Sequence, residues 1–162
     1  MYFFTSTINN WQNLLDDDKI KEILINTLKW FVVNKKAAIQ GFVIMPNHFH
    51  VLWTPLDEYY DLGSSFKSFT GSTILKYLKK ENPEVLKNYI SSQADRKYHF
   101  WKRRSYNIEI MSRAIAGQKL EYIHKNPLQE KWKLVDIAED YLYSSASFYL
   151  SNDDKFSFFV TL

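Results

Sequence analysis

The sequence contains no cysteine, which excludes disulfides and thiolate metal sites and fits a reducing compartment. Glycine and proline are scarce, with four of each, and we find no repeat, low-complexity segment or linker. No apolar stretch approaches the roughly 20 residues that a membrane-spanning helix needs. The N-terminus also lacks the basic start and apolar run of a signal peptide. We therefore expect a soluble, cytoplasmic protein with no membrane partner.

The apolar content of the sequence is high enough to form a hydrophobic core. Apolar residues make up 46% of the 162 residues, which argues against disorder and suits a single domain spanning residues 1–162. Aromatic residues are abundant at 17%, so some rings must lie on the surface. Stacking on nucleic-acid bases is one use for such rings.

Positive charge is concentrated in the middle of the chain. The net charge is only +3, yet residues 61–133 hold 15 Lys/Arg and 7 Asp/Glu, leaving 6 and 11 elsewhere. Such a basic region suits a phosphate-binding face. A solvated helix surface explains the same charges equally well, so charge alone leaves both interpretations open.

Apolar periodicity in the first half predicts three strands and one helix. The strands are expected at residues 2–8, 37–45 and 48–54, and the last two form a hairpin through Pro46-Asn47. The helix follows the capping residues Asp16–Asp18, runs to about Asn34 and carries one apolar stripe. The stripe comprises Ile20, Ile23, Leu24, Leu28 and Phe31.

The second half predicts two helices and one further strand. One helix should start at Ser64 or Ser65 and end at Glu81, with one face formed by Phe66, Phe69, Thr73 and Tyr77. Residues 84–96 suggest a short helix and loop, residues 97–104 a strand, and residues 108–126 the third helix.

The first six elements give the order β-α-β-β-α-β, which is the ferredoxin-like split arrangement of an α+β fold. It predicts a four-stranded antiparallel sheet with two helices on one face. The third helix is an addition to this unit. The C-terminal extension, residues 128–162, should pack on the domain or on a partner.

The predicted strand at 97–104, KYHFWKRR, is both basic and aromatic. Its cations Lys97, Lys102, Arg103 and Arg104 could contact phosphates, while Trp101 stacks on a base. An edge strand with a basic outer face is the alternative.

Two histidines stand out on the third strand. Because side chains alternate along a strand, His48 and His50 point to one side and Phe49 to the other. Two imidazoles on one face suggest half of a metal site, although an unrelated pair is as common. On the third helix, Tyr122 and Asn126 are four residues apart and share a face, whereas His124 lies roughly opposite.

If these two faces meet, they would combine two imidazoles, one amide oxygen and one phenol. Neutral ligands of this kind would hold Mg²⁺ or Mn²⁺ loosely and leave positions for phosphate oxygens. The phenol is then the candidate nucleophile toward a phosphodiester. For any one of the eleven tyrosines, an ordinary place on an amphipathic helix is the commoner role.

Three segments, in order, carry a family resemblance: PNHFHVL, HFWKRRSYN and EYIHKNPLQEKW. Together they resemble the single-tyrosine transposases of the HUH nuclease superfamily (the IS200-like transposases). The third segment is most similar to the REP-associated tyrosine transposases, in which a Tyr-Ile-His-x-Asn-Pro run is typical. The resemblance covers about residues 2–145.

The resemblance implies that His48, His50 and Asn126 bind the metal and that Tyr122 is the nucleophile. Family members cut single-stranded DNA near hairpins and leave a 5′-phosphotyrosine and a free 3′-OH. A nucleoid-associated bacterial protein is expected on this basis. Asn107 departs from the aspartate common in the REP-associated group, and Leu142 stands where Pro-Trp is frequent.

The leading hypothesis is therefore a metal-dependent transposase or nickase for single-stranded DNA. A catalytically silent nucleic-acid-binding module of the same fold is the alternative, and a domesticated nuclease would differ only in its partner. Relatives from mobile elements are often homodimers with shared active sites, whereas REP-associated members can be monomers. The sequence leaves the oligomeric state open.

Overall fold

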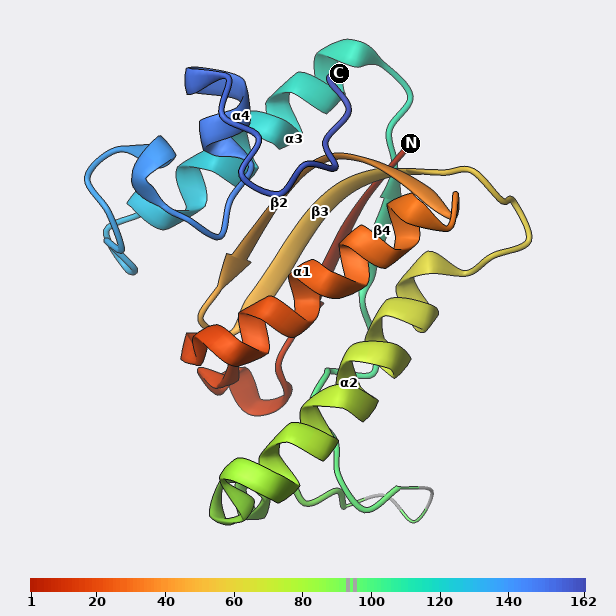
Figure 1. Cartoon of the computed structure of the whole chain (residues 1–162), viewed down its shortest axis with the longest axis vertical. Coiled ribbons are helices and arrows are strands. Elements are labelled where there is room, and N and C mark those ends of the chain that lie inside the picture. Colours follow the sequence, from red (N-terminus) through yellow and green to blue (C-terminus); the bar gives the residue numbers. More distant parts are fainter. Residues whose placement is uncertain (93, 95) are drawn as a thin grey trace.

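The computed structural model describes residues 1–92, 94 and 96–162. Its four strands form one antiparallel sheet in the order β2-β3-β1-β4 (Figure 1). The strands are β1 (Tyr2–Thr7), β2 (Ala37–Met45), β3 (His48–Pro55) and β4 (Tyr106–Glu109). This strand order is that of the ferredoxin-like split fold, so the predicted fold class is confirmed.

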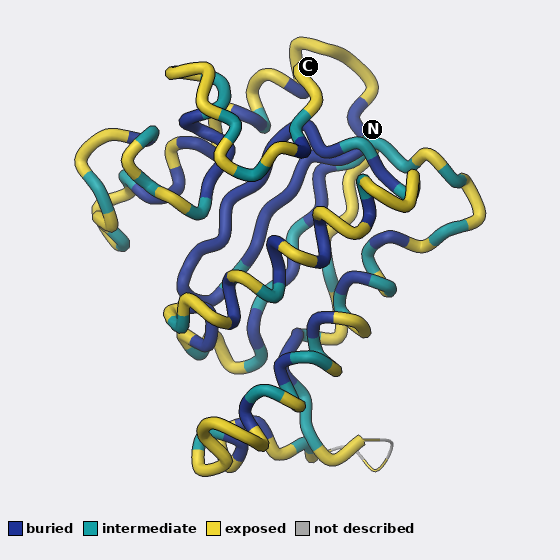
Figure 2. The backbone as a smooth tube through the Cα atoms, viewed as in Figure 1, coloured by how far each residue is buried: buried dark blue, intermediate teal, exposed yellow. Residues whose placement is uncertain are grey.

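The α-helices are α1 (Asp18–Val33), α2 (Leu62–Glu81), α3 (Arg113–Lys125) and α4 (Ala146–Ser151). Short 3-10 helices lie at Asn9–Trp11, Leu14–Asp16, Pro83–Tyr89, Asn126–Leu128 and Ala138–Asp140. Figure 1 shows α1 and α2 across one face of the sheet, with α3 and α4 grouped at its other side. Strands β2 and β3 are mostly buried, whereas the edge strand β4 is exposed (Figure 2).

Helix α1 forms as its sequence predicts. The Asp17 carboxylate accepts a hydrogen bond from the Lys19 backbone N–H at 2.8 Å, which caps the first turn. Within the predicted stripe, Ile20, Leu24, Leu28 and Phe31 are buried and Ile23 is partly buried. This stripe faces the sheet.

Helix α2 buries a different face from the predicted one. It begins after Asp61, whose carboxylate caps Ser64 N–H at 2.9 Å. Phe69 is 56% exposed, and the buried face consists of Leu62, Phe66, Thr70, Ile74 and Leu78. Thr70 can lie in the core because its hydroxyl donates to the Phe66 carbonyl at 2.7 Å.

The fourth strand lies later in the chain than predicted. Residues 97–104 form no regular strand, and the ladder partner of β1 is instead β4. Phe100 and Trp101 are adjacent and both buried, which breaks the alternation that a strand requires. Helix α3 accordingly starts at Arg113 rather than at residue 108, with Ser112 as its cap.

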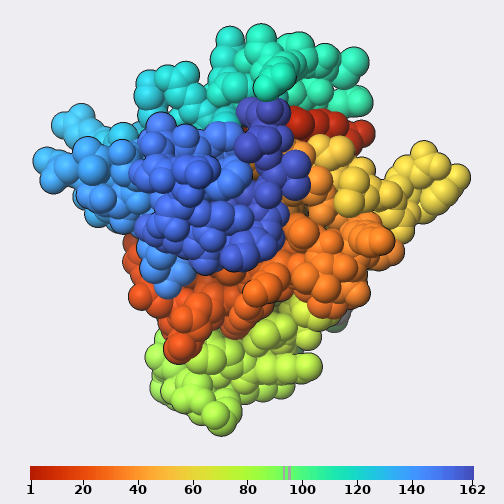
Figure 3. All heavy atoms as spheres, turned by 45° about the horizontal axis from the view of Figure 1, so that its top comes forward, coloured from red at the N-terminus to blue at the C-terminus, as the bar shows by residue number. Residues whose placement is uncertain are grey.

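The C-terminal extension covers the outer edge of β2. Ile44 N–H donates to the Tyr143 carbonyl at 2.9 Å, and Ser145 N–H donates to the Phe42 carbonyl at 3.0 Å. Further along, Phe159 pairs in parallel with Ile39. Figure 3 shows this blue segment packed between α3 and α1. An edge that is covered in this way is protected from pairing with another chain.

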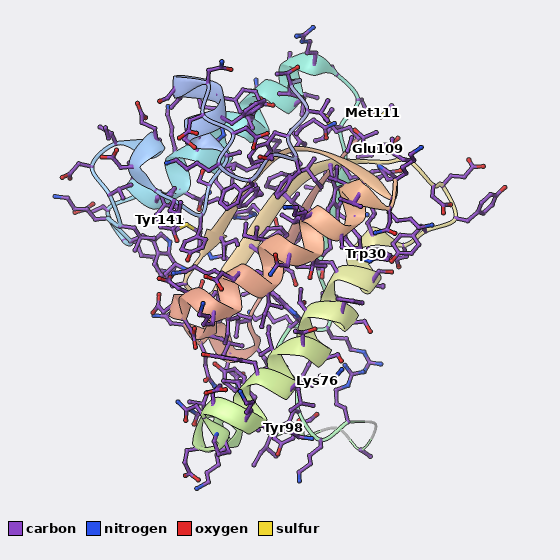
Figure 4. The ribbon with its side chains drawn as sticks, viewed as in Figure 1. Trp30, Lys76, Tyr98, Glu109, Met111 and Tyr141 are labelled. Atoms are coloured by element: carbon purple, nitrogen blue, oxygen red, sulfur yellow. The ribbon has the colours of Figure 1, made fainter. Side chains whose placement is uncertain are left out.

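Two labelled side chains show how the extension and the sheet connect to their neighbours (Figure 4). Tyr141 lies beside the end of β2, and its hydroxyl donates to the Ile44 carbonyl at 2.7 Å. Met111 lies between β4 and α3 and is exposed.

Among the described residues, no helix has the length and apolar content to cross a bilayer.

Candidate active site between strand β3 and helix α3

The histidine pair lies where strand alternation places it. The rings of His48 and His50 are 4.8 Å apart and share the sheet face that α3 covers. Phe49 points to the other face and stacks on Phe66 at 4.7 Å. One strand thus contributes to the core through one face and to a polar site through the other.

His50 is held from β1. Its Nδ1 lies 2.7 Å from the Thr5 hydroxyl, and its ring stacks on Phe3 at 5.4 Å. Both contacts follow from the register, in which Thr5 pairs with His50. The Nε2 atom of His50 is buried and has no hydrogen-bond partner. Such a nitrogen can be satisfied by a bound ion or an ordered water, or can have a functional role.

His48 is oriented by Asn47. The Asn47 amide nitrogen donates to the Trp11 carbonyl at 3.1 Å, so its oxygen faces His48 Nδ1 at 2.8 Å. That oxygen accepts a hydrogen bond from Nδ1–H, which leaves the lone pair on Nε2. A hydrogen bond with the Asn126 side chain also reaches this imidazole.

Both imidazoles are neutral at neutral pH. Burial lowers the pKa of His48 to about 4, against the opposing effect of a hydrogen bond to the Asn126 side chain and with a smaller contribution from the Lys131 charge. Burial likewise lowers the pKa of His50 to about 3, assisted by the charges of His48 and Lys119. Neutral imidazoles keep a nitrogen lone pair available for a metal ion.

Helix α3 brings Tyr122 and Asn126 to the same place. The Tyr122 ring lies 5.3 Å from the His50 ring and is 44% exposed, so its hydroxyl is accessible to a substrate. Asn126 is almost fully buried, and its amide nitrogen donates to the Tyr122 carbonyl at 2.9 Å. Its side chain also interacts with the His48 imidazole. All four predicted residues therefore meet within one chain.

His124 lies outside this site, as its spacing predicts. Its Nε2 is 2.9 Å from the Ser145 hydroxyl, and its ring packs near Tyr149. Burial lowers its pKa to about 4. This histidine ties α3 to the C-terminal extension.

The residues present suit a weakly held divalent cation. Within the described chain, no three His, Cys, Asp or Glu side chains gather in one place. If a metal ion binds here, a third protein ligand would come from another kind of group, and the Asn126 amide is the predicted one. With the unpartnered Nε2 of His50, this amide would make a neutral, incomplete ligand set, to be completed by phosphate oxygens or water around Mg²⁺ or Mn²⁺.

A basic groove of about 620 Å³ runs between α2 and residues 96–103. Lys67 lies in its wall, and its ammonium group donates to the Arg103 carbonyl at 3.0 Å. Tyr98 borders the groove beside α2 (Figure 4). Lys97 lies over the Tyr98 ring at 5.5 Å. Of the predicted DNA-contacting cations, Lys97, Lys102 and Arg103 line this groove, and Arg104 follows, exposed.

Trp101 does not lie where the predicted stacking role requires it. It is only 5% exposed, packs against Phe66 and donates from its indole nitrogen to the Thr70 hydroxyl at 2.9 Å. The exposed indole nearby is Trp11, over which Lys102 lies at 3.7 Å. Because Lys102 N–H also donates to the Thr7 carbonyl, this basic segment adjoins the strand end that pairs with His48.

Sequence reasoning did not identify Phe3, Thr5 and Asn47 as part of the site. Phe3 and Thr5 share a parity on a predicted strand, so alternation alone could have placed both on one face. That Thr5 pairs opposite His50, and Phe3 opposite Leu52, depends on the register between two strands that do not follow one another in the chain. Nothing in the sequence marked Asn47 beyond its position in a turn.

The class that the fold defines is a ferredoxin-like split α+β domain with an added helix against its second sheet face. Among solved structures, the chain is similar to a REP-associated tyrosine transposase bound to a REP hairpin. The TM-score is 0.63 at 20% identity, covering 90% of this chain and 75% of that one. No protein-family model and no curated protein matches. At this identity, the likeness shows a shared fold.

Proposed function

We propose that this protein is a tyrosine transposase or nickase that cleaves and rejoins single-stranded DNA with a divalent metal ion. The observation that carries the proposal is the exposed Tyr122 phenol beside His50, whose buried Nε2 has no partner. The fold shared with a REP-hairpin-bound transposase supports DNA as the substrate. The three sequence motifs also resemble those of such transposases.

In the proposed reaction, the Tyr122 oxygen attacks the phosphorus of one phosphodiester. A P–O bond to tyrosine forms as the bond to the 3′-oxygen breaks, and the phenol proton passes to solvent while the 3′-oxygen is protonated. The product is a 5′-phosphotyrosine with a free 3′-OH. Attack by a 3′-OH on the tyrosyl ester reverses these changes and rejoins the strand.

His48, His50 and Asn126 would hold the cation. Bound there, Mg²⁺ or Mn²⁺ would polarise the scissile phosphate and offset its developing charge. The protein's own contribution is to hold two neutral imidazoles in place, through hydrogen bonds with Asn47 and Thr5. The Asn126 bond to the Tyr122 carbonyl couples the ligand to the helix turn that carries the nucleophile.

The basic groove is the proposed path for DNA outside the site. Lys97, Lys102, Arg103 and Arg104 would contact phosphates, and the exposed Trp11 replaces Trp101 as the ring available for stacking. A hairpin or repeat sequence is the proposed substrate. Because the four site residues meet in one chain, cleavage would not require a second subunit; a homodimer stays a prediction.

The test is incubation with single-stranded hairpin DNA and Mg²⁺ or Mn²⁺, followed by a denaturing gel. The wild type should give a covalent protein–DNA adduct, and Tyr122→Phe should give none. Tyr59→Phe, which alters a tyrosine that is 92% exposed and remote from the site, is the matched control and should react normally.

An adduct that persists in Tyr122→Phe would overturn the assignment of the nucleophile. Binding of the hairpin with no adduct, for any metal tried, would instead favour the catalytically silent binding module.

A further inference from the structure

Two lysines border the histidine pair in matching ways. Each lies over an aromatic ring, and that ring packs against one of the two histidines. The two arrangements come from different parts of the chain, since one lysine is on α3 and the other follows it in the loop after the Asn126–Leu128 turn.

The first arrangement is built around Phe3. The Lys119 ammonium lies 5.0 Å from the centre of the Phe3 ring, which stacks on His50 at 5.4 Å. Lys119 precedes Tyr122 by three residues, so both share a face of α3. Its positive charge also contributes to lowering the pKa of His50.

The second arrangement is built around Trp132. The Lys131 ammonium lies 5.0 Å from the centre of the Trp132 ring, whose centre is 5.9 Å from that of His48. A backbone turn positions the indole, because Trp132 N–H donates to the Gln129 carbonyl at 2.8 Å. The positive charge of Lys131 contributes to lowering the pKa of His48.

Neither cation is neutralised by a nearby carboxylate. In the part of the chain that the structure describes, no Asp or Glu forms an ion pair with Lys119 or Lys131. Lys125 on the same helix differs, since it pairs with Glu121 at 2.5 Å. Two uncompensated cations beside a neutral ligand set favour a polyanion that extends past the site on both sides.

We propose that Lys119 and Lys131 form a two-point clamp for the sugar–phosphate backbone, each holding a phosphate on a different side of the scissile one. The inference rests on the proposed function, because it takes single-stranded DNA as the substrate. It adds two binding residues and the path along which the strand crosses the site, past both the His50 side and the His48 side. The rings of Phe3 and Trp132 hold each ammonium in place through cation–π contact.

The test measures binding in the Tyr122→Phe background, where cleavage chemistry is absent. Hairpin oligonucleotides with single-stranded flanks are titrated by fluorescence anisotropy at several salt concentrations, with Lys119→Met, Lys131→Met and the double variant. Each lysine should reduce the slope of log affinity against log salt by about 0.7, and the double variant by about 1.4. Lys125→Met is the matched control and should leave the slope unchanged.

A second set of oligonucleotides assigns each lysine to its phosphate. A neutral methylphosphonate replaces one linkage at a time near the cleavage position. When both lysines are present, the methylphosphonate should weaken binding at two linkages, one on each side of the cleavage position. Lys119→Met should abolish sensitivity at one linkage only, and Lys131→Met at the other.

The clamp proposal would be overturned if the lysine variants respond to each methylphosphonate as their parent does, or if the salt dependence of binding is unchanged. A uniform loss of affinity without any linkage-specific change would show that the lysines only support the fold of the site. The adduct assay is independent of both readouts. A clamp that binds DNA while the wild type forms no adduct would therefore refute the proposed function alone.

Discussion

The two faces of the sheet differ in what they bury. The face under α1 and α2 is a broad apolar core that includes Leu24, Phe49 and Phe66. The face under α3 has a smaller apolar cluster, including Phe3 and Leu52, beside the two histidines. The same strands build both faces, since alternation separates Phe49 from its histidine neighbours. Stability and the proposed chemistry are thus divided between the two sides of one sheet.

The largest expected effect lies on the apolar face. Phe66→Ala should lower the free energy of unfolding by about 3–5 kcal/mol, because Phe66 is fully buried and packs against Phe4, Phe49 and Trp53. Urea denaturation followed by circular dichroism measures it. A cost below about 1 kcal/mol would mean that this face is not the main source of stability.

On the α3 face, His50→Asn should remove metal binding, because the buried Nε2 that has no partner within the fold is lost. The variant also gives up the Thr5 hydrogen bond and the Phe3 stacking, so its stability is measured alongside. The loss of Mn²⁺ affinity should exceed the roughly 10–100-fold that changes in supporting residues cause. Calorimetric Mn²⁺ titration is the measurement, and His124→Asn is the control. If both variants bind Mn²⁺ equally well, His50 is not a ligand.

Thr5→Val should have a smaller effect on the same property. It removes the hydroxyl 2.7 Å from His50 Nδ1 while keeping the side-chain volume. We expect Mn²⁺ affinity to fall by about 10–100-fold, as is typical when an orienting partner is lost. Thr73→Val, on α2 behind the other face of the sheet, is the control in this titration. Equal losses in the two variants would point to a general packing effect.

A more gradual effect, spread over the range from pH 6.5 to about 4, is a pH dependence of stability at His124. Its folded pKa of about 4 lies below the ordinary value of 6.5, so the unfolded state binds the proton first as pH falls. The stability contribution is complete above pH 6.5 and is lost as pH falls toward 4. As pH falls through that window, the free energy of unfolding of the wild type should decrease by about 1.4 kcal/mol per pH unit more than that of His124→Gln.

Denaturation curves at pH 4.5, 5.5 and 6.5, with EDTA present, provide this comparison. Because His48 and His50 remain in both proteins, their titration cancels in the difference. Parallel pH profiles for the two proteins would show that His124 is not held neutral by the fold.

Much of the site follows from local geometry. The two-residue period of β3 places His48 and His50 on one face, and the turn of α3 places Tyr122 and Asn126 on one side. These relations depend only on neighbours in the chain. The segment at 97–104 fails for the opposite reason, because burial of Trp101 against Thr70 overrides its strand-like composition.

By itself, the sequence determined the order of the main elements, the shared face of the histidines and the four-residue step from Tyr122 to Asn126. Each follows from a backbone period, which is local. Only the tertiary structure decided that the strand face and the helix face meet in one chain, that Thr5 and Asn47 orient the imidazoles, and that two lysines border them. These depend on strand register and on long-range packing, which no local period encodes.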